Sequence, residues 1–111
     1  MPRDAETWAL LGRVDKDAWI AKWHRPGSTS EQMREDAAYE DALLRAAIES
    51  YISGFRQDPR HYFSGINALT LIHLYQHLTG DTRYENMARI KRTLAFVQIR
   101  LLRELPFLPG P

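Results

Sequence analysis

The sequence predicts an all-α protein built as an antiparallel array of four helices. Four segments repeat apolar residues at steps of three and four, no segment alternates apolar and polar residues as a strand does, and Gly, Pro, Ser and Asp separate the segments. With 111 residues, 44% of them apolar and 26% charged, the composition is that of one globular domain. We therefore expect residues 1–111 to form a single domain, either whole or as a piece of a longer helical array.

The first predicted helix covers residues 6–23 and ends at Arg25-Pro26-Gly27-Ser28. Apolar residues recur along one predicted side of it: Trp8, Leu11, Val14, Ala18 and Ala21. Since one side of a helix is not expected to hold all three tryptophans, Trp19 or Trp23 should be exposed.

The second predicted helix runs from about residue 28 to residue 56. Ser28 with Glu31 and Thr29 with Gln32 form overlapping capping boxes at its start, and Asp58-Pro59 ends it. Its early part, to about Glu40, is polar and expected to be exposed. Its later part carries a predicted buried stripe: Leu44, Ala47, Ile48, Tyr51, Ile52 and Phe55.

The third predicted helix, over residues 65–78, is apolar on nearly every side, so it is expected to be central. Gly80 suits the left-handed residue that closes a helix, and Thr82 with Glu85 forms a capping box for the next. That fourth helix is predicted over residues 83–104. Its stripe is Met87, Ile90, Leu94, Val97 and Leu101.

Several classes of function are disfavoured by composition. The net charge of +1 gives no general attraction to nucleic acid or membranes, and the basic residues of the fourth segment, such as Arg89 and Arg92, are not interleaved with aromatic residues that could stack on bases. The N-terminus does not read as a secretory signal, and the absence of cysteine fits a reducing cytoplasm. With no Gly-rich phosphate loop and no nucleophile elbow, we expect neither an enzyme nor a cofactor.

A metal or small-ligand site is the alternative function. His73 and His77 lie four residues apart on one predicted helix, a spacing that suits two imidazole ligands. However, Leu74 stands where the zincin motif needs a glutamate, and no third ligand is evident nearby. We therefore predict no metal, with one histidine hydrogen-bonded inside the bundle and the other in solvent.

Two blocks resemble the helices of a tetratricopeptide repeat. Residues 8–12, Trp-Ala-Leu-Leu-Gly, resemble the opening of its first helix through Trp8, Leu11 and Gly12. Small and aromatic residues at steps of four, three and five resemble its second helix and terminal proline: Ala47, Tyr51, Gly54 and Pro59. The 35 residues from Gly12 to Ala47 exceed the usual spacing, so we expect a loop and an extra helical turn around residues 25–39.

A more specific resemblance covers residues 6–102. Residues 6–17, 51–55, 58–60, 62–63 and 65–67 together resemble the TRAFs-binding region, which occurs beside the kinase domain of apoptosis signal-regulating kinases and in bacterial tetratricopeptide proteins. This resemblance implies a non-catalytic signalling scaffold or regulatory domain. Its expected partner is another protein or peptide.

Candidate binding residues lie on the third and fourth segments. Gly65 permits close backbone approach, and Tyr62 and Asn67 stand at the same helix entry. Asn67 either bonds local peptide groups or faces a concave surface that holds a partner's backbone. Phe96 and Ile99 flank the stripe of the fourth segment, so one neighbouring helix cannot cover them. We expect them to support a homodimer, unless residues 105–108 fold back over them.

Overall fold

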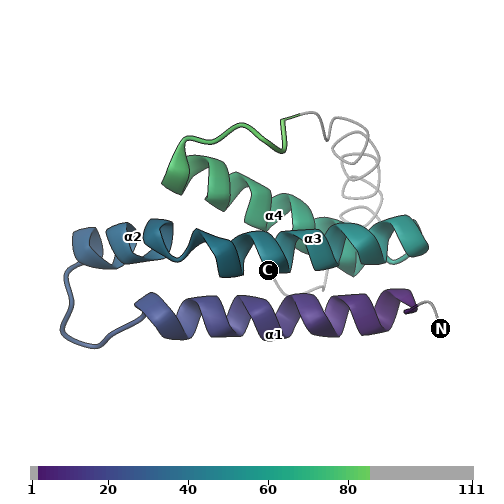
Figure 1. The fold of residues 1–111 in the computed structure, drawn as a ribbon. Coiled ribbons are helices and arrows are strands. Elements are labelled where there is room, and N and C mark those ends of the chain that lie inside the picture. The colour runs from purple at the N-terminus through teal and green to yellow at the C-terminus, as the bar shows by residue number, and fades with distance from the viewer. Residues whose placement is uncertain (1–2, 86–111) are drawn as a thin grey trace, which may run out of the picture.

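A computed structural model describes residues 3–85 of this chain. They form four α-helices: α1 (Ala5–Trp23), α2 (Ser30–Tyr39), α3 (Asp41–Gln57) and α4 (Tyr62–Thr79). α1 packs on α3 and α3 packs on α4, while α2 and α3 follow one another in a row along α1 (Figure 1). The prediction of an all-α array of helical hairpins is confirmed. The stripe predicted for the segment 83–104 lies outside the described residues.

The core of the described part is built around α3. All six residues of its predicted stripe are buried, and Leu44, Ala47, Ile48 and Tyr51 are fully so. Full burial of one such large apolar side chain contributes roughly 1.5–3 kcal/mol. Because α3 contacts both α1 and α4, which scarcely touch one another, α3 is the element that joins the described helices.

The helix ends follow local sequence signals. Asp4 caps α1 by accepting the Thr7 N–H at 2.8 Å, and α3 stops at Gln57 because Asp58, which precedes Pro59, is extended. Gly80 closes α4 with φ at +73°, a conformation that favours glycine. These ends fix the connections between α1, α3 and α4.

The prediction of one helix from residue 28 to residue 56 is wrong, because the chain breaks at Glu40 between α2 and α3. The indole Nε1–H of Trp19 donates to the Ala37 carbonyl at 3.0 Å. In an unbroken helix this carbonyl would accept the N–H of Asp41, so a donor from α1 occupies the acceptor at the break. The insertion expected around residues 25–39 is accordingly a loop and a whole separate helix, which Thr29 caps through Gln32.

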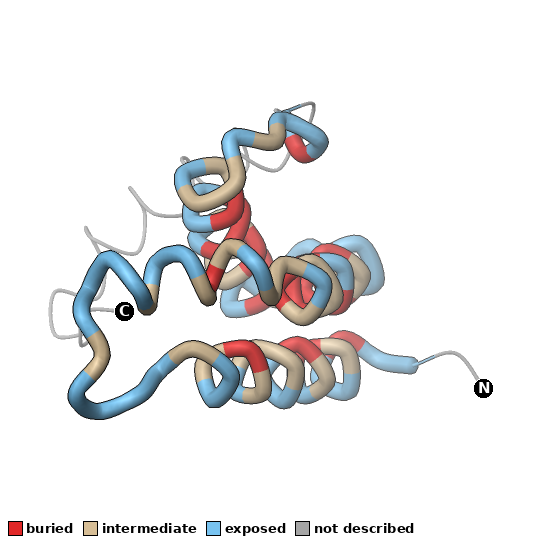
Figure 2. The backbone as a smooth tube through the Cα atoms, turned by 60° about the vertical axis from the view of Figure 1, so that its left-hand side comes forward, coloured by how far each residue is buried: buried red, intermediate tan, exposed pale blue. Residues whose placement is uncertain are grey.

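The face predicted for α1 is also wrong in part. Val14 and Ala21 are exposed, and the buried residues are mostly small: Ala5, Ala9, Gly12 and Trp19. Figure 2 shows that the buried positions of α1 lie on the side toward the other helices. Trp19 is 4% exposed and Trp23 is partly buried beside it, with ring centroids 5.4 Å apart. Trp19 and Trp23 follow Trp8 by 11 and 15 residues, which places all three side chains within about 60° around the helix axis. All three tryptophans therefore turn inward at least in part.

α4 is not the central helix among the described elements, and it begins at Tyr62 rather than Gly65. Its buried side carries mostly small and medium residues: Ser64, Gly65, Ala68, Leu71, Ile72 and Tyr75. The opposite side leaves Phe63 and Leu74 exposed. The helix was predicted to be central because nearly every side of it is apolar. The packed side is instead the one that carries small residues, which allow helices to approach closely.

Two glycines allow the helices to come close together. A Cβ on Gly12 would lie 2.8 Å from Cε2 of Tyr51, so the tyrosine ring lies flat against the backbone of α1. A Cβ on Gly54 would lie 2.8 Å from Ser64 Oγ and 3.2 Å from the Ala5 carbonyl oxygen. Gly54 therefore stands where α1, α3 and α4 converge. None of the four described helices is long and apolar enough to cross a membrane.

Candidate interaction surface

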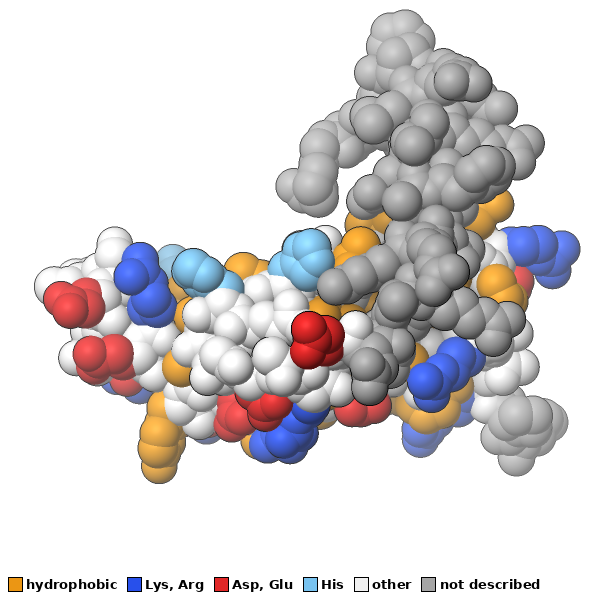
Figure 3. All heavy atoms as spheres, turned by 90° about the horizontal axis from the view of Figure 1, so that it is seen from above, with side chains coloured by type: hydrophobic (Ala, Val, Ile, Leu, Met, Phe, Trp, Pro, Cys, Tyr) orange, Lys and Arg blue, Asp and Glu red, His pale blue; other side chains and the backbone are white. Residues whose placement is uncertain are grey.

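The solvent side of α4 is the candidate interaction surface. We call it the outer face of α4, and its exposed members are Tyr62, Phe63, Thr70, His73, Leu74 and His77. Phe63 is 60% exposed and Leu74 is 41% exposed. Hydrophobic and histidine side chains gather side by side on the face of the molecule seen in Figure 3.

The outer face of α4 carries no carboxylate, guanidinium or ammonium group. From His61 to Gly80 the sequence contains no Asp, Glu, Lys or Arg. Hydroxyl and imidazole groups supply its polarity. Such a surface can bury apolar side chains without stripping water from a full charge, which is the expensive part of forming an interface.

The four predicted partner-binding residues are only partly described. Tyr62 is 37% exposed at the start of the outer face of α4. Asn67 is half-buried, and its Nδ2 donates to the Phe63 carbonyl at 2.9 Å, which is the local bond that one of the two interpretations expected. Phe96 and Ile99 lie outside the described residues.

Phe63 and Leu74 are surface residues that the sequence interpretation did not identify as binding candidates. One signal could have found them. Ser64 and Ala68 are four residues apart, and with Gly65 they make one side of the helix small. Large residues on the far side of such a helix, including Phe63 and Leu74, are then the ones left for solvent or a partner.

The residues of the predicted repeat pattern lie mainly along the contact between α1 and α3. Gly12, Ala47, Tyr51 and Gly54 are buried there, and Gly65 is buried in α4. Trp8 and Leu11 are half-buried, with the Arg3 guanidinium 5.0 Å from the centre of the Trp8 ring. Pro59 is exposed in the connection between α3 and α4.

His73 and His77, the alternative ligand pair, are both exposed on the outer face of α4. The expectation that one of them bonds inside the bundle is therefore wrong. Within residues 3–85, no group of three or more histidine, aspartate or glutamate side chains could hold a metal ion. The histidine that does bond internally is His61, whose Nδ1 lies 2.7 Å from the Oγ of buried Ser64.

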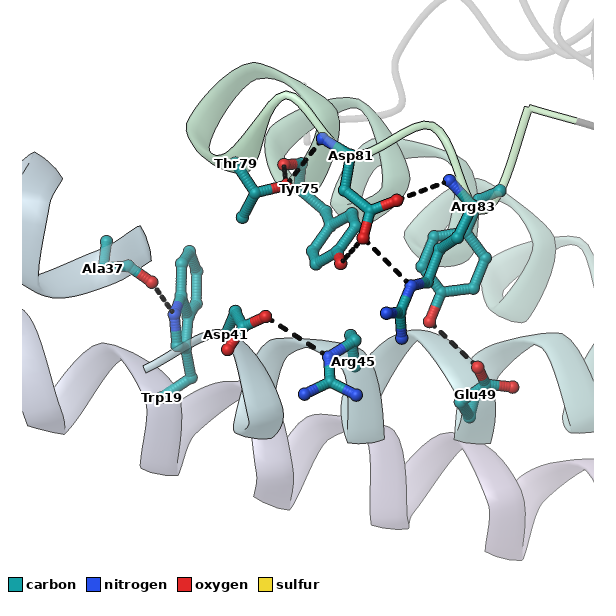
Figure 4. A network of polar contacts seen from close by, with 10 residues as sticks. Trp19, Ala37, Asp41, Arg45, Glu49, Tyr75, Thr79, Asp81 and Arg83 are labelled. Atoms are coloured by element: carbon teal, nitrogen blue, oxygen red, sulfur yellow. Dashed lines mark hydrogen bonds and ion pairs between the residues drawn. The ribbon is translucent and has the colours of Figure 1, made fainter. Parts of the chain in front are cut away.

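A network of hydrogen bonds fixes the chain that leaves α4 (Figure 4). The Tyr75 hydroxyl donates to Asp81 Oδ2 at 2.8 Å, and the backbone N–H of Arg83 donates to Oδ1 at 2.9 Å. The Tyr84 hydroxyl donates to Glu49 Oε1 of α3 at 2.9 Å, and its ring lies 5.4 Å from that of Tyr75. These bonds hold residues 81–84 against α3 and α4.

The same contacts shift the protonation of their members. The Tyr75 hydroxyl and then the Arg83 N–H lower the pKa of Asp81, since both donate to its charged form. Burial, followed by the Glu49 carboxylate, raises the pKa of Tyr84 well above its usual range. Burial also raises the pKa of Tyr75 and of Tyr51. The network is therefore stable with Asp81 ionised and both tyrosines neutral.

Alkaline pH should destabilise the protein through these tyrosines. A tyrosine whose pKa is raised by folding ionises first in the unfolded chain, so its contribution is complete below about pH 10 and is lost as pH rises further. We expect the melting temperature of the wild type to fall more steeply between pH 9 and 11 than that of Tyr84→Phe. Tyr39→Phe, which changes an 84% exposed side chain, is the control. Equal slopes for the wild type and Tyr84→Phe would contradict the prediction.

Comparison with known proteins places this geometry in a family. No curated protein and no solved structure gives a significant match to the chain. The family model TPR-S, Tetratricopeptide Repeats-Sensor, matches residues 1–72, which span α1, α2, α3 and the first part of α4. The match includes the close contacts at Gly12 and Gly54 and the start of the outer face of α4. With well over half of its length matched, this chain belongs to the Tetratricopeptide Repeats-Sensor family.

Proposed function

We propose that the chain binds another protein or peptide through the outer face of α4. The observation that carries this proposal is the exposure of Phe63 and Leu74 on a helix without formal charge. Single exposed apolar residues are common on folded domains, but Phe63 and Leu74 lie on the same side of one helix, and that side carries no formal charge, which favours an interaction surface. Helical-repeat modules present such surfaces to partners, and they need no catalytic group to do so.

The chemistry of this face defines the class of partner. Tyr62, Phe63 and Leu74 would act as anchors, because a few large side chains in the centre of an interface contribute most of the binding energy. A charged partner segment would lose its hydration there without gaining an opposite charge. The partner should therefore present an apolar or uncharged polar segment, such as one side of an amphipathic helix.

The proposal extends to the biological role of this binding. The resemblance of residues 6–17 and of the blocks 51–55, 58–60, 62–63 and 65–67 to the TRAFs-binding region supports a signalling scaffold or regulatory domain. The word sensor in the family description supports the same direction. A homodimer through Phe96 and Ile99 is a second arrangement, and it rests on the sequence alone.

Affinity capture with matched variants tests the proposal. The baits are the wild type, Leu74→Glu, and Leu10→Glu, whose leucine is 61% exposed on α1. Each captured protein is identified, purified and titrated against the three baits by calorimetry. Loss of a central contact costs about 2 kcal/mol or more, so Leu74→Glu should weaken binding roughly thirtyfold or more. Leu10→Glu should bind as the wild type does.

Two results would count against this function. Binding that Leu10→Glu weakens and Leu74→Glu leaves unchanged would move the surface from α4 to α1. Light scattering of the free wild type and of a further variant, Ile99→Glu, separates the homodimer from capture of another protein. If the wild type is a dimer and Ile99→Glu is a monomer, the second arrangement replaces the first.

A further inference from the structure

α2 is attached to the other helices by few contacts. Ala37 is its single buried residue, and most of its surface is polar and exposed. On one side it is joined to α1 by residues 24–29, where Gly27 takes a φ of +89°. On the other side it meets α3 at Glu40, which makes no side-chain capping bond to the start of α3. Few buried apolar contacts and exposed backbone bonds are the marks of a segment that opens locally.

Two polar contacts tie α2 to α1 and the loop. Arg25 Nη1 lies 3.8 Å from Asp36 Oδ2, but the Arg25 side chain is 64% exposed, so this ion pair contributes little. The indole N–H of Trp19 donates to the Ala37 carbonyl at 3.0 Å in a buried setting. Removing that donor would leave a buried carbonyl without its partner, so the Trp19 bond is the stronger tie.

The helix α2 is also self-contained. Thr29 Oγ1 accepts the N–H of Gln32 at its start, and Gln32 Nε2 donates to Asp36 Oδ1 one turn later. The fully buried side chains of α3, such as Tyr51 and Ile52, pack in the part of the molecule built by α1, α3 and α4. Separation of α2 would therefore leave that packing in place.

We propose that α2 is a hinged segment that opens as one unit from the body formed by α1, α3 and α4. Its hinges are residues 24–29 and Glu40, and the bond between Trp19 and Ala37 is the latch. Opening uncovers Trp19 and the parts of α1 and α4 that α2 contacts, which are covered in the closed form. This movement is separate from binding at the outer face of α4, because that face is exposed while α2 is closed.

Once detached from its neighbours, a helix of 10 residues is marginal in water, so the amides of α2 exchange in the open form. Hydrogen exchange measured by mass spectrometry therefore tests the latch with a matched pair of variants. Trp19→Phe removes the donor to Ala37. Trp23→Phe removes an indole from the same aromatic pair, but the N–H of Trp23 has no partner among residues 3–85. We expect amides of residues 30–39 to exchange on the order of tenfold faster in Trp19→Phe, while those of residues 44–55 keep their rates. Trp23→Phe should leave the ratio of the two regions unchanged.

The exchange pattern decides in every case. If residues 30–39 and 44–55 accelerate together in Trp19→Phe, the indole stabilises the whole fold and α2 is not a separate unit. If both tryptophan variants accelerate α2 equally, ring packing holds it and the hydrogen bond is not the latch. If Trp19→Phe fails to fold, the wild type still tests the proposal, which requires residues 30–39 to exchange faster than residues 44–55. Equal rates in the two regions would contradict it.

Discussion

Leucine at position 54 should lower the free energy of unfolding by about 1–3 kcal/mol, the usual cost of forcing methylene groups into a packed site. A Cβ there would meet atoms of two neighbouring helices at once: Ser64 Oγ of α4 at 2.8 Å, and the Ala5 carbonyl oxygen and Trp8 Cβ of α1 at 3.2 Å and 3.3 Å. Ser64 Oγ lies 2.7 Å from His61 Nδ1, so turning the hydroxyl away would disturb that contact. The gain in helix propensity from replacing glycine is at most about 1 kcal/mol.

Urea denaturation at neutral pH measures this cost. Ala42→Leu adds the same side chain to an exposed position of α3 and should change stability by no more than about 0.5 kcal/mol. An unchanged or raised stability of Gly54→Leu would show that α1, α3 and α4 separate at this point without cost. That outcome would remove the packing reason for a glycine in the repeat pattern.

A compensating pair of changes should appear at the contact between Gly12 and Tyr51. Tyr51→Ala empties a fully buried site and should cost about 3–5 kcal/mol, as other large aromatic truncations do. Gly12→Leu should cost about 1–3 kcal/mol, because its Cβ would meet the Tyr51 ring at 2.8–3.0 Å. In the double variant the leucine can enter the space of the lost ring. The double variant should therefore lose about 0.5–3 kcal/mol less than the sum of the single changes.

Urea denaturation of the wild type, the two single variants and the double variant measures this coupling, and Tyr51→Phe serves as the control. The Tyr51 hydroxyl is buried without a hydrogen-bond partner among the described residues, so its removal should be nearly neutral or stabilising. Strict additivity of Gly12→Leu and Tyr51→Ala would mean that the two positions do not share the space between α1 and α3. A large loss in Tyr51→Phe would instead reveal a partner for the hydroxyl in solution.

The sequence by itself determined the all-α class, most of the helix ends and the buried side of α3. Asp58-Pro59 and Gly80 act through their own backbone preferences, so they end α3 and α4 whatever packs nearby. The stripe from Leu44 to Phe55 is unambiguous because its remaining sides carry small or charged residues. The tetratricopeptide pattern could also be recognised from the sequence, since Gly12 and Gly54 mark close helix contacts at fixed spacing.

Tertiary structure alone decided where the second predicted helix breaks and which side of α4 is left outside. The break at Glu40 accompanies a hydrogen bond from Trp19, a residue 18 positions before Ala37, and no local preference encodes that donor. On α4 nearly every side is apolar, so periodicity could not rank the sides. Packing ranks them: the side with the small residues Ser64, Gly65 and Ala68 is buried, and Ser64 meets Gly54 of α3, while Phe63 and Leu74 are left outside.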